Sequence, residues 1–265
     1  MKNDLLEKLE PKAQRGSKAR CHFLTHGSNE HIAQRLTDLI SPWGQVDVND
    51  TWMPQGFENQ AEAQLGRGDI LLDPEINNLL VDWWLAVPLR ARVPNWDIAS
   101  TCTINGCKGL LLIEAKAHDQ ELNLEQAGKR QEITETENSR RNRIHIAECI
   151  SGANQKLCEA TGLPWALSIE HNYRMSNRFA WAWKLTELGM PVILVYLGFL
   201  HGNEMNDRGI PFANHEMWKQ LVISHSKPLF PPEIWDRQWT VNGQVFIPLV
   251  KSIEQPLDIT SMEAE

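Results

Sequence analysis

Apolar residues recur at the three- and four-residue spacing of an α-helix in four stretches of the chain. Because side chains with this spacing share one face of a helix, the pattern predicts helices over residues 29–40, 74–87, 144–159 and 173–188. Ser28 and Asp73 can serve as N-caps for the first two, and Pro74 fits a first helical turn. Residues 57–65, which carry Glu58 and Glu62, predict a further short helix that the glycines of 66–68 end.

The β signals are one buried strand and two hairpins. Residues 192–200, VILVYLGFL, form a continuous apolar run that is typical of a strand covered on both faces. The dipeptides at 105–106 and 242–243 are both Asn-Gly, which predicts two-residue hairpin turns. The first twenty residues and residues 119–143 are polar, so we expect a loose N-terminal segment and a solvated helix or loop.

The turn at Asn105-Gly106 sets the register of the first hairpin. Asn-Gly suits a type I′ turn, because both of its central positions need a positive φ. If these two residues form the loop, cross-strand partners have numbers that sum to 211, as in the pair of Ile104 with Cys107. Ile98 then pairs with Ile113, and both point into the core.

Three charged residues of this hairpin share the opposite face. Under the same register Asp97 pairs with Glu114, and Lys116 lies two residues further on the same side. Opposed carboxylates are destabilising, so their charge must be offset. A divalent cation does this most simply, because Mg²⁺ takes one or two carboxylates and leaves positions open for a phosphate. A four-residue loop shifted by one residue would instead set Asp97 opposite Lys116, as an ion pair.

Charge and composition narrow the function classes. The formal net charge of −8 over 265 residues argues against a protein that coats nucleic acid non-specifically, although it allows a local basic groove. The five cysteines include no Cys-x-x-Cys pair and the N-terminus is charged, so we expect a reducing, cytoplasmic location. The apolar run at 191–200 is too short to cross a bilayer, which predicts a soluble protein without a membrane partner.

On these residues the chain resembles the PD-(D/E)xK nuclease superfamily, which has the restriction-endonuclease-like fold. In that family an aspartate on one strand and a (D/E)xK motif on the next bind the catalytic metal. Asp97 matches the aspartate, Glu114 the acidic position and Lys116 the lysine. The resemblance covers mainly residues 94–118 and, more loosely, 57–200. A long insertion at 119–172 and the two residues between the proline and the aspartate depart from the family pattern.

The resemblance implies a mixed α/β (α+β) fold, in which helices flank a central mixed sheet. We expect an N-terminal helical segment, a nuclease-like core with a helical insertion, a C-terminal hairpin extension packed on the core, and a mobile acidic tail. These parts cover residues 1–56, 57–200 with the insertion at 119–172, 201–250 and 251–265.

The activity that the resemblance implies is metal-dependent hydrolysis of phosphodiester bonds, with DNA as the expected substrate. Asp97, Glu114 and the backbone carbonyl of Ala115 would hold Mg²⁺, or Mn²⁺ in its place, which lowers the pKa of a bound water. Lys116 would orient that water and stabilise the developing negative charge. Such enzymes commonly add an acid from a preceding helix, for which we choose Glu62 over Glu75 and Asp82.

Substrate binding requires positive charge beside the metal site. The predicted helix at 173–188 offers it best, since it carries Arg174 and Arg178. Asn177 lies one turn from Tyr173, and both are expected to face the site. His118 lies two residues beyond Lys116 on the same face, so it is a further candidate for contact with the substrate.

Two alternatives stay open on the sequence alone. One is a non-catalytic module that keeps the fold and binds nucleic acid or a protein. The other is an unrelated fold in which Glu-Ala-Lys occurs by chance, and this would separate Asp97 from Glu114. Whether the chain acts alone or as a homodimer is also open.

Overall fold

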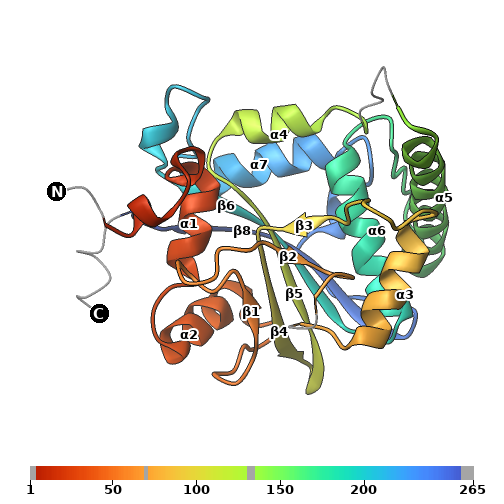
Figure 1. Cartoon of the computed structure of the whole chain (residues 1–265), viewed down its shortest axis with the longest axis horizontal. Helices are drawn as coiled ribbons and strands as arrows, with labels where there is room; N and C mark the ends of the chain where they lie inside the picture. The colour runs from red at the N-terminus through yellow and green to blue at the C-terminus, as the bar shows by residue number, and fades with distance from the viewer. Residues whose placement is uncertain (1–3, 69–70, 130–134, 258–265) are drawn as a thin grey trace.

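A six-stranded mixed sheet forms the centre of the computed structural model, which describes residues 4–68, 71–129 and 135–257 (Figure 1). The strand order is β1-β4-β5-β6-β8-β7. The pairs β5–β6 and β6–β8 are parallel, and the outer pairs are antiparallel. The strands are β1 (Trp52–Met53), β4 (Ile98–Ile104), β5 (Cys107–Lys116), β6 (Val192–Leu200), β7 (Trp239–Val241) and β8 (Gln244–Glu254). The predicted mixed α/β class is confirmed.

Helices cover both faces of this sheet (Figure 1). On one face α1 (Gly16–Leu24) and α2 (Asn29–Ile40) pack against the side chains that β4, β5 and β6 direct to that side. The other face is covered by a larger set of helices and contains most of the tryptophans. These helices are α3 (Pro74–Trp84), α4 (Asp119–Glu125), α5 (Glu137–Thr161), α6 (Tyr173–Glu187) and α7 (His215–Ser226). Both faces of the central strands are therefore buried.

Both hairpins have the predicted turns. Asn105 and Gly106 have φ values of 49° and 80°, and Ile98 pairs with Ile113 as the sum of 211 requires. Both isoleucines are fully buried, on the side of α1 and α2. The second hairpin turns at residues 242–243, again with positive φ at both. Its strand β8 lies next to β6, so the segment predicted as a C-terminal extension contributes two strands to the central sheet.

Most predicted helices are present with small shifts. Ser28 and Asp73 cap α2 and α3 as expected, since each side chain accepts a hydrogen bond from a backbone N–H of the first turn. α5 begins at Glu137 rather than at 144, because Thr136 provides an earlier cap. The polar stretch before it is not wholly solvated, since α4 buries Leu122 and Glu125. Helix α7 was not predicted.

Two sequence-based expectations are wrong. The N-terminal segment is not loose from residue 4 onward, while residues 1–3 lie outside the described residues. After two short 3₁₀ helices, Leu6–Lys8 and Pro11–Ala13, α1 follows, and buried residues of this segment pack around Phe57. Residues 57–65 do not form a helix. The strand β2 (Ala63–Gln64) instead pairs with β3 (Asn95–Trp96), so tertiary pairing overrides the local helical preference.

Across the described ranges, we find no helix with both the length and the apolar character needed to span a bilayer. Asp258, Glu263 and Glu265 of the predicted acidic tail lie outside the described residues.

Candidate active site

Asp97 lies where the chain passes from one sheet to the other. Residues 95–96 pair with β2, and from Ile98 onward the chain pairs with β5, so the backbone bends at Asp97. The half-buried carboxylate turns towards β5, where the backbone N–H of Ala115 donates to Asp97 Oδ2 at 2.8 Å. The hairpin thus brings Asp97 beside Glu114, as its register predicts.

Glu114 is fully buried and is surrounded by cations. Arg178 Nε donates to Glu114 Oε2 at 2.7 Å, while Lys116 Nζ donates to Oε1. Arg174 Nη1 lies 3.3 Å from the same Oε1. Burial alone would raise the pKa of Glu114, but Arg178, Lys116 and Arg174 outweigh it and hold this pKa well below its usual value. Glu114 is therefore ionised.

The second carboxylate of the pair has the opposite bias. Burial and the negative charge of Glu114 raise the pKa of Asp97 to about 7, against weaker opposing effects of Lys116 and the Ala115 N–H. Two neighbouring acids with pKa values pushed apart are typical of catalytic sites, although buried ion-pair networks do the same. The repulsion between the two carboxylates that the sequence led us to expect thus contributes to the raised pKa of Asp97.

A third acid, Glu125 of α4, completes the buried cluster. Its Oε1 lies 2.9 Å from Lys116 Nζ and 3.3 Å from Arg174 Nε, without the alignment of a hydrogen bond. Burial lowers the pKa of Lys116, but Glu114 and Glu125 outweigh this effect and raise it, so the ammonium stays charged. The sequence analysis did not identify Glu125. The one pattern that points to it is its position three residues after the apolar Leu122, on the same buried face of α4.

Helix α6 carries the residues predicted to bind substrate, except His118. Arg178 is pinned inside the protein: its guanidinium also donates to Asn177 Oδ1 and to the carbonyl of Asn95, and it stacks 4.5 Å from the centre of the Trp96 ring. Arg174 is different, because 53% of its side chain is exposed. The cation available to a ligand on this helix is therefore Arg174.

A cavity of about 490 Å³ opens over Asp97. Its walls carry Tyr173, Arg174, Asn177 and Arg178 from α6, together with Glu62. Arg92 and Lys129 add positive charge, and the remaining wall residues are Trp84, Val93, Pro94 and Asn95. A cationic cavity with one aspartate is suited to an anionic ligand that is held next to a metal.

Glu114, Ala115 and Lys116 are buried and are not among the residues that line this cavity. Two further predicted site residues also lie differently from expectation. Glu62 is not helical but sits just before β2, where it accepts a hydrogen bond from Asn95 Nδ2 at 2.7 Å and pairs with Lys18 at 3.1 Å. It still lines the cavity. His118 is not among the residues that line it, because the chain turns there into α4 and the histidine is buried. The rivals Glu75 and Asp82 are exposed on α3.

The oxygen atoms near Asp97 fit a hard divalent cation. Carboxylates and a backbone carbonyl are ligands that Mg²⁺ accepts, and Asp97, Glu114 and Ala115 provide them. Burial and, after it, repulsion by Glu114 raise the pKa of Asp97, and a bound cation would offset both effects. Lys116 Nζ lies 3.2 Å from the Ala115 carbonyl, and both oxygens of Glu114 already have cationic partners. Metal binding at Glu114 therefore competes with these cations, of which Arg174 is the exposed one.

Comparison of the chain with protein-family models, with curated proteins and with solved structures finds no match in any of the three.

Proposed function

We propose that this protein is a Mg²⁺-dependent nuclease of the PD-(D/E)xK type, with DNA as its substrate. The observation that carries the proposal is the reach of the Asp97 carboxylate across to Ala115, between Glu114 and Lys116. Asp97, Glu114 and the Ala115 carbonyl would hold the cation. The mixed sheet with helices on both faces is compatible with the restriction-endonuclease-like fold, which we include in the proposal.

Residues of the chain would orient the water, stabilise charge and bind the phosphate. When bound, the cation would polarise the phosphate and supply a hydroxide-like water. Lys116, held charged between two buried glutamates, donates a hydrogen bond to the attacking water and stabilises negative charge on the phosphate. Arg174 and Lys129 face the cavity and bind phosphate oxygens. Arg178 holds Glu114 and Trp96 in place.

The test is cleavage by the purified full chain of single-stranded DNA, double-stranded DNA and RNA, with Mg²⁺, Mn²⁺ or EDTA. We expect metal-dependent cleavage by the wild type and at least a hundredfold loss in Lys116→Ala. The matched control is Lys108→Ala, an exposed lysine on the same strand, which should cleave normally. Equal cleavage by the wild type and Lys116→Ala would attribute the activity to a contaminant and refute the proposal.

One observation favours a second candidate, a non-catalytic binding module. Lys116, Arg174 and Arg178 together neutralise Glu114, so the described cluster is electrostatically satisfied without a metal. A module of this kind would bind nucleic acid through the cationic cavity. Its signature would be DNA binding that neither Mg²⁺ nor Lys116→Ala changes, with no cleavage.

A further inference from the structure

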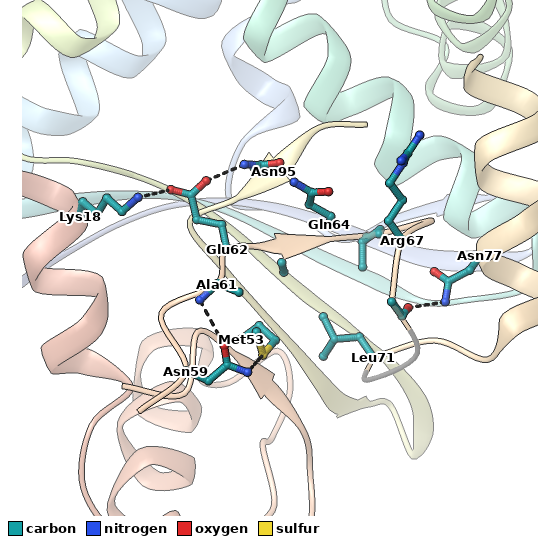
Figure 2. A pocket seen from close by; sticks show the side chains of 13 residues that line it. Lys18, Met53, Asn59, Ala61, Glu62, Gln64, Arg67, Leu71, Asn77 and Asn95 are labelled. Atoms are coloured by element: carbon teal, nitrogen blue, oxygen red, sulfur yellow. Dashed lines mark hydrogen bonds and ion pairs between the residues drawn. The ribbon is translucent and has the colours of Figure 1, made fainter. Parts of the chain in front are cut away.

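A second cavity adjoins the first at the small sheet of β2 and β3. Its volume is about 480 Å³, within the range of about 300–1,000 Å³ that is typical of small-molecule sites. Glu62 and Asn95 line both cavities. Figure 2 shows these two residues joined by a hydrogen bond at the upper rim of the second cavity. A ligand with one part beside Asp97 therefore has the second cavity as its immediate neighbour.

The walls of the second cavity combine an apolar surface with amide groups. Met53, Leu65 and Leu71 provide apolar contacts. Gln64 pairs with Asn95 across the two strands, and its side-chain amide has no hydrogen-bond partner among the described residues. An amide of this kind offers one acceptor and two donors in one plane. The cavity can thus contact the face of a flat ring and hydrogen-bond to its edge.

Two cationic side chains in the walls of the second cavity suit the phosphates of a nucleic-acid strand. Arg67 uses Nη2 to donate to the carbonyl of Pro88 at 2.9 Å, while the other N–H groups of its guanidinium have no partner within the described part of the chain. Lys18, on another wall, is paired with Glu62. The free donors of Arg67 can contact a phosphate adjacent to the bound nucleotide.

We propose that this cavity binds one unpaired nucleobase of the strand whose phosphate lies beside Asp97, an inference that rests on the proposed nuclease function. The apolar walls contact the base, and the Gln64 amide hydrogen-bonds to its edge. A base inside a duplex is already paired and stacked, and taking it out costs a few kcal/mol. The substrate class is therefore single-stranded DNA or DNA with an unpaired nucleotide at the cleaved position.

The experiment compares ligands with and without a base. Wild-type protein in Mg²⁺ is titrated by calorimetry with each of the four deoxynucleoside 5′-monophosphates and with 2-deoxyribose 5-phosphate. We expect at least one nucleotide to bind tenfold more tightly than the sugar phosphate. Ala61→Trp should remove this difference, since Ala61 is an exposed residue of the cavity wall and the larger ring fills the space. Gln64→Ala should reduce the difference at least threefold.

The controls keep the two proposals separate. Ala213→Trp, at an exposed alanine outside both cavities, should retain the tenfold preference, and Ala61→Trp should bind the sugar phosphate as the wild type does. A preference for nucleotides that Ala61→Trp removes supports the base site even if no cleavage is found, in which case only the nuclease proposal fails. Equal binding of nucleotides and sugar phosphate by the wild type, or an unchanged preference in Ala61→Trp, would overturn the base site while leaving metal-dependent cleavage intact.

Discussion

Arg174 Nη1, on a half-exposed side chain at the start of α6, lies 3.3 Å from the carboxylate Oε1 of the fully buried Glu114. This contact links the surface of the cavity to the buried acid. Arg178, one turn further along α6, contacts Glu114 Oε2 from inside the core. The two arginines therefore differ in freedom: the Arg174 side chain is exposed enough to change its partner, as the proposed phosphate contact requires, and Arg178 is fixed.

The first prediction concerns this exchange. Arg174→Gln removes a cation that competes with the metal for Glu114 and also removes a phosphate contact. We expect Mg²⁺ to bind a few-fold more tightly by calorimetry, while KM for DNA rises about tenfold. Arg140→Gln, at an exposed arginine of α5, is the matched control. Weaker Mg²⁺ binding in Arg174→Gln would show that the arginine supports the metal site instead of competing with it.

Asp97→Asn should stabilise the metal-free protein. The pKa of Asp97 is about 7 in the folded chain, so between pH 4 and 7 the unfolded chain loses this proton first and stability falls as the pH rises. Asparagine keeps an acceptor for the Ala115 N–H and has no charge. In EDTA at pH 8 we expect the free energy of unfolding to increase by about 1–2 kcal/mol, after allowance for solvent screening.

The same variant has a built-in control. Added Mg²⁺ should raise the Tm of the wild type, because a ligand that binds the folded chain stabilises it, and should leave that of Asp97→Asn unchanged. If the variant is less stable than the wild type in EDTA at pH 8, the Asp97 carboxylate is not repelled by Glu114.

Glu125→Gln tests the role of the buried acid on α4. The change keeps the shape of the side chain but leaves Glu114 as the remaining carboxylate within ion-pair distance of Lys116 Nζ. Burial raises the pKa of Glu125, so its charge does not favour the folded chain, and we expect little change in stability but a fall in kcat of about tenfold with KM unchanged. Glu137→Gln, at an exposed position of α5, serves for comparison. A kcat equal to that of the control variant would show that Glu125 does not position Lys116.

Burial of His225 should make the free energy of unfolding fall at low pH, by an effect separate from catalysis. It is buried near the end of α7, where Asn172 Nδ2 donates to its carbonyl at 2.8 Å. Burial, with a smaller effect of Lys116, lowers its pKa to about 4. The unfolded chain takes up this proton near pH 6.5 and the folded chain only near pH 4. Stability is therefore present above pH 6.5 and falls by about 3 kcal/mol as the pH drops to 4.

Urea unfolding at several pH values between 7.5 and 4.5 measures this loss. His225→Gln should remove this loss, so that the variant gains stability relative to the wild type as the pH falls, in addition to the opposite trend that Asp97 gives both proteins; His31→Gln, at an exposed histidine of α2, should not. An identical pH dependence in the wild type and His225→Gln would show that His225 makes no such contribution.

Local chemistry explains which features the sequence predicted. Asn105-Gly106 fixes a two-residue turn, and that turn alone sets which residues of β4 and β5 oppose each other. The position of Asp97 beside β5, one residue before the Ile98–Ile113 pair, follows from this short-range signal. Ser28 and Asp73 likewise mark helix starts through side chains that act within one turn.

The features that the sequence did not predict depend on distant contacts. Residues 57–65 have a helical composition, yet Gln64 pairs with Asn95, and this pairing is invisible in a local window. The bend between β3 and β4 brings Trp96 against Arg178 on α6, a contact that no local pattern indicates. Glu125 reaches the site only because α4 folds back over β5.

The central claim is that Asp97 and Glu114 share a divalent cation. Crystals grown with Mn²⁺ and measured at its absorption edge test it most directly. We predict one anomalous peak bonded to oxygens of Asp97, Glu114 and the Ala115 carbonyl, with Arg174 withdrawn from Glu114. A structure without a peak at saturating Mn²⁺, in which Arg174 and Arg178 still hold Glu114, would contradict the account.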